Sequence, residues 1–389
     1  MAPDSPKGDL ATDALPPLLP GEEFHLHKLI IEESNAGKRI DKVLASVEAV
    51  GTRSQASRLL ARGLIFLADA RGKASAVKPS HVVKVGEEFR IHVPFIPKLT
   101  LVPYDFPLEI AYEDSDLIVV DKPAGLVVHP AYGHAQDTLV NALLHHTKDL
   151  SQGFDEIRPG LIHRLDKDTS GLIVIAKNEI AQRKIAMQFQ NKITHRIYRA
   201  IVFGEMKPTV GTITSYLKRH PEDRRRSASV EASEPNSKFA ITHYRTLETH
   251  PSTLSLVELK LETGRTHQIR VHVKEAGHPV VGDVTYGAEG RTNGLKSVAL
   301  RKLIGDLPRF ALHAFELGFY HPTKGDFIRL KSKWPTDLRP LVDHCGFPLF
   351  GDVPIVERFE KRPADEYPWP LVRAAALPKV ADTDEDDDV

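Results

Sequence analysis

The sequence predicts an α+β protein, in which helices and loops flank a mixed, mainly antiparallel sheet and a small α/β domain precedes it. Between residues 109 and 345, short runs rich in β-branched residues alternate with three amphipathic segments, a pattern typical of strands interleaved with helices. Between residues 37 and 93, two helical patterns are followed by short alternating strands. The 389 residues are enough for two or three domains with hydrophobic cores.

The composition of successive segments indicates the domain boundaries. We expect an acidic flexible arm and a first strand over 1–36, the small domain over 37–93, a linker over 94–108, the main domain over 109–345 and an acidic tail over 346–389. The arm is rich in Pro, Asp and Ala and has no periodicity. The linker carries four prolines, which oppose helix formation and favour an extended chain.

Two helices are predicted at the start of the small domain. The first follows from apolar residues at the spacing of one helix face, namely Ile40, Val43, Leu44 and Val47. Thr52 is placed to cap the second helix and Gly63 to end it. The inward face of this helix is formed by Ala56, Leu59 and Leu60. Another side carries Arg53, Arg58 and Arg62.

In the main domain, strands and helices alternate. Strands are predicted over 116–123, 125–130, 171–177, 198–204 and 253–264, and helices over 138–147, 178–190 and 267–277. The basic stretch 217–238 is expected to be a long surface insertion.

The net charge of zero hides an uneven distribution. Lys and Arg together number 52, as do Asp and Glu. Residues 1–37 and 376–389 each carry a net charge of −5, which leaves +10 for the body between them. From 38 to 93 there are 11 basic and 5 acidic residues, an electrostatic footprint that suits phosphates, although a solvated helix face would explain it equally.

Several protein classes are excluded. The single Cys345 forms no intramolecular disulfide, and the sequence has neither a secretory signal nor an apolar run long enough for a membrane span. We therefore expect a cytoplasmic protein without membrane attachment. No heptad repeat suggests assembly, so a monomer is expected. The 19 histidines show no His-Glu-x-x-His pattern, and no metal site is predicted.

Three polar stretches are candidates for the chemistry. The first, HRLDKDTSG from His163 to Gly171, lies between an apolar pair and an apolar strand, which places Asp166 on a turn at the edge of a buried sheet. The second holds Arg265, His267, Gln268 and Arg270 near the start of a helix, where the dipole favours anions. In the third, Lys122 and His129 flank a strand–turn–strand. Structural alternatives remain open for two of them: the first stretch could be an ordinary capped loop, and the arginines of the second could be solvent-exposed surface residues.

Taken in order, these stretches resemble one family, the RluA-type pseudouridine synthases. HRLDKDTSG resembles the family's catalytic-aspartate motif, Tyr198 in THRIYRAIV its tyrosine, and LETGRTHQIRVHVKEAGHPVVGDVTYG its third motif. The resemblance spans about residues 109–340. The unit over 37–93 resembles an S4-type RNA-binding domain, although LADARG stands where that family commonly has a Val-Asn-Gly turn.

This resemblance implies a fold of pseudouridine synthase type and the isomerisation of uridine in RNA without a cofactor. It implies that Asp166 is the catalytic carboxylate, that Arg270 pairs with it and that Tyr198 stacks on the target uracil. Whether the carboxylate attacks C1′, adds to C6 or removes the 2′ proton stays open. The implied partner is ribosomal RNA or the pre-ribosomal large subunit, with transfer RNA as an alternative substrate.

The remaining polar residues are expected to contact RNA. They are Arg164, which would fill the space that a turned-out base vacates, together with Arg265, His267, Gln268, Lys122 and His129, and with Arg53, Arg58 and Arg62 of the small domain. Two rival functions remain open, a non-catalytic ribosome-assembly factor that binds RNA and a nucleoside hydrolase that releases free uracil.

Overall fold

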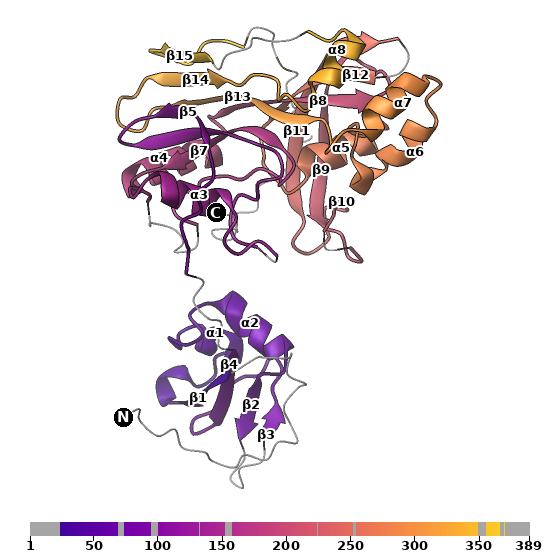
Figure 1. Cartoon of the computed structure of the whole chain (residues 1–389). Coiled ribbons are helices and arrows are strands. Elements are labelled where there is room, and N and C mark those ends of the chain that lie inside the picture. The colour runs from indigo at the N-terminus through magenta and orange to yellow at the C-terminus, as the bar shows by residue number, and fades with distance from the viewer. Residues whose placement is uncertain are drawn as a thin grey trace. The chain divides into compact units, whose positions relative to one another are not determined.

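The computed structural model describes residues 24–68, 74–94, 100–131, 133–151, 158–223, 225–251, 254–348, 355–365 and 369. The chain divides into two compact units, Met1–Lys98 and Leu99–Val389, each with its own hydrophobic core (Figure 1). The predicted arm over 1–23 and the acidic end of the tail over 370–389 lie outside the described residues.

The smaller unit is a four-stranded antiparallel sheet with two short helices. The strand order is β1-β4-β2-β3, with bounds β1 Phe24–Ile30, β2 Ile65–Ala68, β3 Ala74–Ala76 and β4 Glu88–Pro94. Because β1 pairs along its whole length with β4, residues 24–30 belong to the sheet of this unit, which therefore extends before the predicted start at residue 37. The strand foreseen within 1–36 belongs to this sheet.

Both predicted helices of the smaller unit are present. The 3-10 turn η2 Glu33–Asn35 precedes α1 Ile40–Leu44, and α2 Arg53–Ala61 follows. Thr52 caps α2, since its side chain accepts a hydrogen bond from the backbone N–H of Gln55 at 3.1 Å, and Gly63 ends the helical turn with a φ of +67°. The predicted apolar faces meet in one core, with Ile40, Leu44, Ala56, Leu59, Leu60 and Phe89 all buried.

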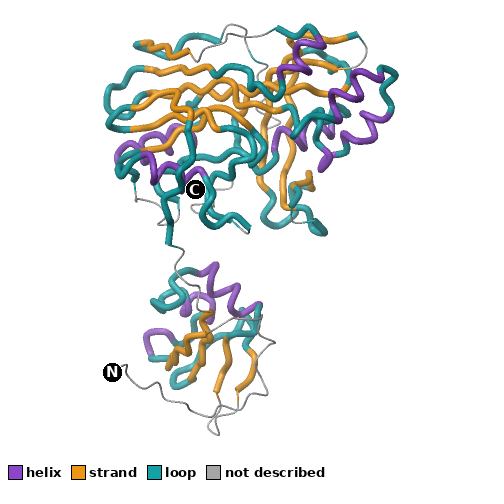
Figure 2. The backbone as a smooth tube through the Cα atoms, in the orientation of Figure 1, coloured by secondary structure: helices purple, strands orange, loops and turns teal. Residues whose placement is uncertain are grey.

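The larger unit is built on an eleven-stranded sheet (Figure 1 and Figure 2). Its main path runs β10-β9-β11-β12-β8-β13-β7-β6-β5, and β14 and β15 extend it beside β13. The bounds are β5 Glu109–Glu113, β6 Leu117–Lys122, β7 Ser170–Ala176, β8 His195–Phe203, β9 Val210–Arg219, β10 Ser227–Val230, β11 Lys238–His250, β12 Leu254–Leu261, β13 Leu312–Tyr320, β14 Phe327–Lys331 and β15 Ile355–Phe359. Every described strand pair is antiparallel except β7 with β13, so the predicted mixed, mainly antiparallel sheet is confirmed.

Helices flank this sheet. They are α3 Leu139–His146, α4 Glu179–Gln190, α5 Gln268–Glu275, α6 Ala288–Asn293, α7 Val298–Gly305 and α8 Arg339–Cys345, with the 3-10 turn η3 Val284–Tyr286. The three predicted helices correspond to α3, α4 and α5. The short helices α6, α7 and α8 and the turn η3 were not foreseen.

Strands β6 and β7 separate two cores. Because alternate side chains of a strand point to opposite faces, Leu172 and Val174 of β7 pack with Ile185 of α4, whereas Ile173 and Ile175 pack in the core that includes α3. Helices α3 and α4 thus cover opposite faces of this part of the sheet. The polar loop that precedes β7 is therefore attached directly to the buried centre of the unit.

The predicted strand over 125–130 is absent. The carbonyls of Val127 and Val128 accept hydrogen bonds from the N–H groups of Leu139 and Val140, at the start of α3. Leu126 and Val128 are buried, so this segment contributes apolar side chains to the core without joining the sheet.

The segments predicted as a linker and as a tail are in part packed on the larger unit. In the expected linker, the carbonyl of Val102 accepts a hydrogen bond from the Asn141 side chain at 2.8 Å, and Phe106 and Leu108 pack on the main core. In the expected tail, β15 pairs with β14 and Arg358 forms an ion pair with Asp326 at 2.8 Å. Residues 355–359 therefore belong to the sheet rather than to a tail, and the linker residues pack on the core, because both segments make contacts with distant parts of the chain.

The stretch 217–238 contributes to the sheet. It includes the end of β9, the whole of β10 and the start of β11. Ser227 of β10 lies opposite Arg219 of β9. The expected surface insertion is therefore an edge hairpin of the sheet.

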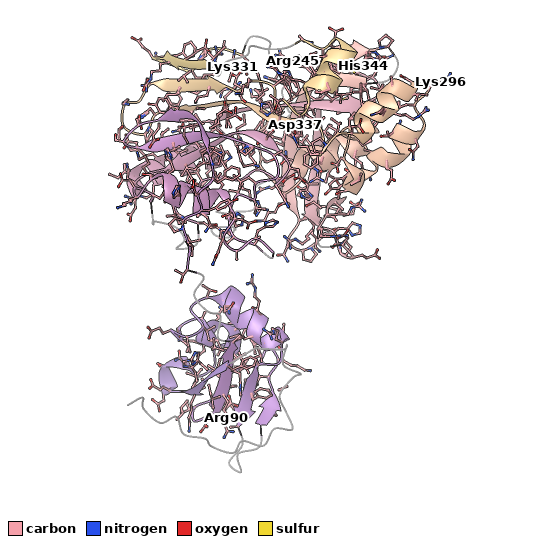
Figure 3. All side chains as sticks on the ribbon, viewed as in Figure 1. Arg90, Arg245, Lys296, Lys331, Asp337 and His344 are labelled. Carbon is pink, nitrogen blue, oxygen red and sulfur yellow. The ribbon has the colours of Figure 1, made fainter. Side chains whose placement is uncertain are left out.

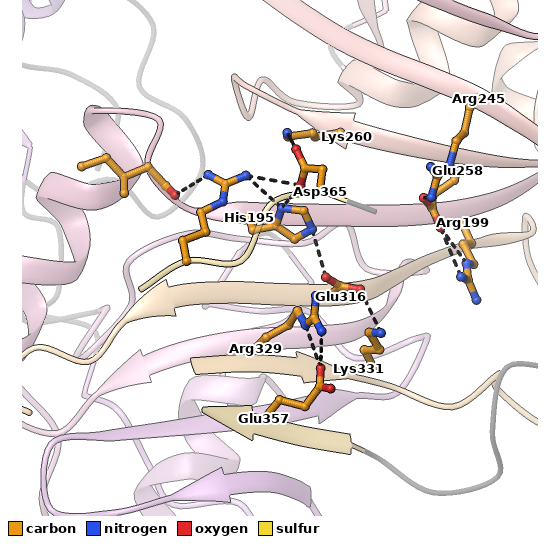
Figure 4. A network of polar contacts seen from close by, with 12 residues as sticks. His195, Arg199, Arg245, Glu258, Lys260, Glu316, Arg329, Lys331, Glu357 and Asp365 are labelled. Atoms are coloured by element: carbon orange, nitrogen blue, oxygen red, sulfur yellow. Dashed lines mark hydrogen bonds and ion pairs between the residues drawn. The ribbon is translucent and has the colours of Figure 1, made fainter. Parts of the chain in front are cut away.

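A polar network lies on one face of β8 (Figure 4). Ile197 and Arg199 line a cavity of about 510 Å³ and alternate along the strand with Tyr198, which therefore points to the other face. His195 lies between two carboxylates, Glu316 of β13 at 2.9 Å and Asp365 of the tail at 3.2 Å. These contacts hold the tail against the sheet, on the face away from Tyr198.

No helix among the described residues is both long enough and apolar enough to cross a membrane.

One buried histidine makes the stability of the folded protein depend on pH. His313 of β13 is 1% exposed, its Nδ1 lies 2.9 Å from the Ser170 hydroxyl, and its ring stacks on Trp334. Burial lowers the pKa of His313 from 6.5 to about 3, and the charge of Arg309 acts in the same direction. Between pH 6.5 and 3, this histidine is therefore protonated in the unfolded chain but not in the folded chain. The free energy of unfolding consequently falls as the pH falls through this window.

We expect His313→Asn, which keeps a polar atom near the Nδ1 position, to remove this acid sensitivity. Relative to the variant, the free energy of unfolding of the wild type should fall by up to about 1.4 kcal/mol per pH unit below pH 6, and the difference should stay constant above pH 7. Urea unfolding, followed by tryptophan fluorescence between pH 4.5 and 8, measures it. A difference that does not change with pH would contradict the assignment.

Candidate active site

Asp166 lies on the loop that enters β7. Its carboxylate is 25% exposed, and its carbonyl accepts a hydrogen bond from the N–H of Thr169, which closes the turn. The neighbouring Leu165 is buried in the main core and anchors the loop. Gly171 is required where the loop becomes a strand: its φ is +112°, and a Cβ there would lie 2.2 Å from the carbonyl oxygen of Ala314 on β13.

Two buried cations hold the backbone directly after Asp166. The Lys122 ammonium donates to the carbonyl of Lys167 at 3.0 Å and to those of Pro123 and Leu126 at 2.8 and 2.9 Å. The Arg309 guanidinium donates to the carbonyl of Asp168 at 3.2 Å. The loop is thereby fixed to β6 on one side and to the segment before β13 on the other.

Arg309 is itself held in place. Its guanidinium forms a bidentate pair with Asp337, which is labelled in Figure 3, at 2.7 and 3.1 Å, and also donates to the Ser170 hydroxyl at 2.9 Å. A bidentate pair fixes the plane of the guanidinium as well as its position. The carbonyl of Asp168 therefore meets a donor of fixed direction.

Arg270, in the first turn of α5, joins two carboxylates. Its Nη1 lies 3.2 Å from Oδ2 of Asp166, while Nε and Nη2 bind Asp283 at 2.7 and 3.0 Å. The guanidinium also lies over the rings of Phe310 and Tyr286, at 4.2 and 4.9 Å. Burial opposes its charge, but the hydrogen bonds and charge of Asp283 outweigh burial and raise the pKa of Arg270. Arg270 is thus a permanent, oriented cation beside Asp166.

Tyr198 brings an aromatic ring to the same site from β8. The side chain is buried, and burial raises the pKa of Tyr198 to about 12; the charge of Asp166 adds to the rise, while Arg196 opposes it. The phenol consequently keeps its proton at neutral pH and is a hydrogen-bond donor.

His267 caps α5 in the left-handed conformation, with φ 57° and ψ 19°. Its Nε2 lies 3.9 Å from Oδ2 of Asp166, and its Nδ1 lies 2.9 Å from the Tyr286 hydroxyl. Burial lowers the pKa of His267, so the ring is neutral at pH 7. The contact with Asp166 is therefore between a carboxylate and a neutral imidazole.

The structure brings together four of the residues predicted for the site. Asp166, Arg270, His267 and Tyr198 converge as described, although they lie far apart in the sequence. Arg164 is exposed and its guanidinium donates to the Thr266 hydroxyl, which joins the first and third motifs at the surface.

Two predicted RNA contacts do not fit their surroundings. Gln268 is 2% exposed; its oxygen accepts from Thr263 and Arg265, and its nitrogen donates to Ile241 and Thr242. Lys122 is fully buried, and its three N–H groups match three carbonyls. Both residues support the site from within, so the prediction that they contact RNA is wrong for this conformation.

The other predicted contacts differ in exposure. Arg53, Arg58 and Arg62, in and directly after α2, are all exposed, and Arg53 in addition binds the buried Asp41 at 2.9 Å and so supports the smaller unit. Arg265 is half-buried, with its Nε donating to the carbonyl of Phe239 at 3.2 Å, and His129 is half-buried too.

Sequence reasoning assigned no role to four residues that shape the site. Asp283 and Tyr286 lie within the third motif, in GDVTYG, and the spacing of an acidic and an aromatic residue after the helix was the available signal. Arg309 and Asp337 stand outside every motif and carried no signal.

One cluster among the described residues has the composition of a metal site. Ligand atoms of Asp114, Asp116 and His321 lie within 4.8 Å of one another. However, Oδ2 of Asp114 already accepts hydrogen bonds from Tyr112 at 2.7 Å, His321 at 2.7 Å and Lys324 at 2.8 Å. Protein donors thus occupy the oxygens that a cation would need, and we interpret the cluster as structural.

Comparison with known proteins adds independent information. A family model described as RNA pseudouridylate synthase matches residues 116–275, which include Asp166, Tyr198 and Arg270. A protein of Aquifex aeolicus named as an uncharacterized RNA pseudouridine synthase is 41% identical over 299 residues, covering 77% of this chain and 90% of that protein. The ribosomal large subunit pseudouridine synthase D of Zymomonas mobilis is 39% identical over 318 residues, covering 81% and 96%. Its namesake in Pseudomonas aeruginosa is 39% identical over 304 residues, covering 77% and 90%.

The role of Lys122 in holding the loop is testable by substitution. Lys122→Met keeps the length of the side chain but removes the donor to the carbonyls of Pro123 and Leu126, whereas the carbonyl of Lys167 keeps the N–H of Gly125 at 2.9 Å. Each buried carbonyl that stays unsatisfied costs about 1–3 kcal/mol. We expect the free energy of unfolding to fall by about 3 kcal/mol or more. Lys302→Met is the matched control, since this exposed lysine pairs with Asp306 in solvent and its loss should leave the stability nearly unchanged. Equal stability of the two variants in urea unfolding would refute the role.

Proposed function

This chain belongs to the family of RNA pseudouridine synthases, and we propose that it converts specific uridines of large-subunit ribosomal RNA to pseudouridine. The observation that carries the proposal is the placement of Asp166, a partly exposed carboxylate that Arg270 orients beside the buried phenol of Tyr198. The reaction breaks the N1–C1′ bond, turns the base and joins C5 to C1′.

The conversion balances without a co-reactant. One proton leaves C5 and one is added at N1, so there is no oxidation, reduction or net hydrolysis. The chain therefore needs to supply a carboxylate, proton donors and acceptors, and a site that excludes water while the base is detached. We propose accordingly that it works without a cofactor.

Asp166 is the proposed catalytic residue. Attack on C1′, addition to C6 and removal of the 2′ proton all require the same ionised and oriented carboxylate. Arg270 fixes Oδ2 by a charge-assisted hydrogen bond, and Asp283 fixes Arg270. The geometry thus supports the carboxylate role without depending on the route.

Tyr198 and Arg164 are proposed to receive the target nucleotide. A stacked uracil must leave its helix to reach Asp166, which requires a surface for the base and a group for the vacated space. The Tyr198 ring offers a stacking face, and its protonated hydroxyl is a donor for the proton movements at the base. Arg164, exposed two residues before Asp166, is placed to enter the vacated space.

The substrate class rests on the relatives and on the smaller unit. Relatives that cover most of this chain are named for the large ribosomal subunit. The exposed Arg58 and Arg62 of α2 suit the phosphates of RNA, as expected for a domain of S4 type. We propose that the protein acts as a cytoplasmic monomer on ribosomal RNA or on the pre-ribosomal large subunit.

Loss of the Asp166 carboxylate should abolish the reaction but not RNA binding. Conversion of 5-tritiated uridine in large-subunit RNA releases tritium to water, and we expect wild type to release it and Asp166→Asn to release at least about 10³-fold less. Filter binding should give similar dissociation constants, because the amide keeps the shape of the side chain. Equal release by both proteins would refute the role of Asp166. Free uracil among the products would indicate a hydrolase, and release by neither protein would favour an RNA-binding factor.

Neutralising the basic face of α2 should reduce the salt dependence of binding. Each phosphate contact contributes about 0.7–0.9 to the slope of log K against log salt, so Arg58→Gln combined with Arg62→Gln should lower that slope by up to about 1.8. Lys28→Gln, an exposed lysine of β1 that pairs with Glu88, is the control and should leave the slope unchanged. An unaltered slope in the double variant would exclude α2 from the RNA interface.

A further inference from the structure

The hydroxyl of Tyr286 lies where three parts of the chain meet. Tyr286 ends η3 and is 3% exposed. Its oxygen accepts a hydrogen bond from the N–H of Ser227 on β10 at 2.8 Å and lies 3.2 Å from the Ser227 carbonyl. On the other side it lies 2.9 Å from Nδ1 of His267. One phenol thus connects an edge strand of the sheet with the residue that caps α5.

The reactive carboxylate is the next group along this line. Nε2 of His267 lies 3.9 Å from Oδ2 of Asp166, the oxygen that Arg270 also binds. This distance exceeds a hydrogen bond by about 1 Å. A small movement of the imidazole would therefore create or remove a hydrogen bond to the proposed catalytic residue.

We propose that Tyr286 and His267 are positioning residues that couple the β9–β10 hairpin to Asp166. The inference rests on the proposed role of Asp166. In this coupling, the hydrogen of the Tyr286 hydroxyl decides which ring nitrogen of His267 carries the proton, and hence what the imidazole presents to the carboxylate.

The coupling depends on the single hydrogen of the Tyr286 hydroxyl. A phenol has one hydrogen, and the Ser227 N–H already donates to its oxygen, so that hydrogen goes either to Nδ1 of His267 or to the Ser227 carbonyl. In the first arrangement Nε2 carries the ring proton and presents a donor to Asp166. In the second, Nδ1 must donate to the phenol, and Nε2 presents a lone pair to a carboxylate, which is repulsive.

The backbone of His267 supports a positioning role. A φ of 57° is unusual for any residue other than glycine, and it is found here at the position that aims a side chain at Asp166. The His267 ring meets the Tyr286 ring edge-on at 5.7 Å, which holds the imidazole in one orientation.

The hairpin is placed to sense RNA. Residues 217–227 include five basic and two acidic residues, and Arg219 and Arg225 are exposed. The Arg226 guanidinium lies 5.4 Å from the Tyr286 ring, and Ser229 binds Glu275 of α5 at 2.5 Å. A phosphate backbone drawn to this edge would therefore act on β10, whose Ser227 competes for the hydroxyl hydrogen of Tyr286.

The test is a double-mutant cycle measured in single-turnover reactions, with enzyme in excess over 5-tritiated large-subunit RNA. Tyr286→Phe removes the hydroxyl and keeps the ring over Arg270, and His267→Asn keeps a residue that tolerates a positive φ. We expect each variant to react about tenfold more slowly, with RNA dissociation constants within about twofold of wild type, and the double variant to be about tenfold slower rather than a hundredfold. Tyr320→Phe is the matched control, because that hydroxyl accepts from the N–H of Arg362 in the tail segment.

A second arm tests the hairpin. Arg219→Gln combined with Arg225→Gln should slow the saturated reaction in the wild-type background and cause no further slowing in the Tyr286→Phe background. Independent effects in either cycle, or a rate for Tyr286→Phe equal to that of Tyr320→Phe, would overturn the coupling. Wild-type activity combined with such a result would leave the proposed function intact, whereas a wild type without activity would refute the function itself.

Discussion

The bridge from Asp283 through Arg270 to Asp166 is the interaction on which the rest of the site depends. A buried guanidinium with one acidic partner would be a costly charge to hold in place. With two carboxylates and two aromatic rings around it, Arg270 is a fixed cation. Helix α5 and the turn η3 matter to the chemistry because they bring these partners together.

The sheet supports this bridge by fixing the other side of the site. The loop of Asp166 enters β7 at the centre of the sheet, and Tyr198 projects from β8, with β13 paired between these two strands. Lys122 and Arg309 hold the carbonyls that follow Asp166, so the loop cannot relax toward solvent when RNA leaves. A polar site of this kind remains ordered because buried donors outside it satisfy its backbone.

Sequence reasoning predicted the contact between Asp166 and Arg270 more reliably than the residues that support it. Asp166 and Arg270 were predicted from motifs, and their contact at 3.2 Å agrees with the pairing that the resemblance implied. Gln268 was placed at the RNA surface because residue type does not report burial, which here depends on hydrogen bonds to β11 and its neighbours. Strand β15 was missed because an edge strand pairs through its backbone and tolerates a charged sequence. The apolar segment over 125–130 was mistaken for a strand because α3, and no neighbouring strand, supplies its hydrogen bonds.

The late position of β13 in the chain has a consequence for synthesis. Strands β7 and β8 are made first, yet in the finished sheet both pair with β13, which ends at Tyr320. While the chain is still growing on the ribosome, each of these two strands therefore has an unpaired, apolar edge, and such edges are open to wrong partners. The central gap closes only after more than a hundred further residues have left the exit tunnel. An enzyme of this architecture therefore cannot complete its sheet until β13 has emerged, and until then its nascent chain needs protection from aggregation.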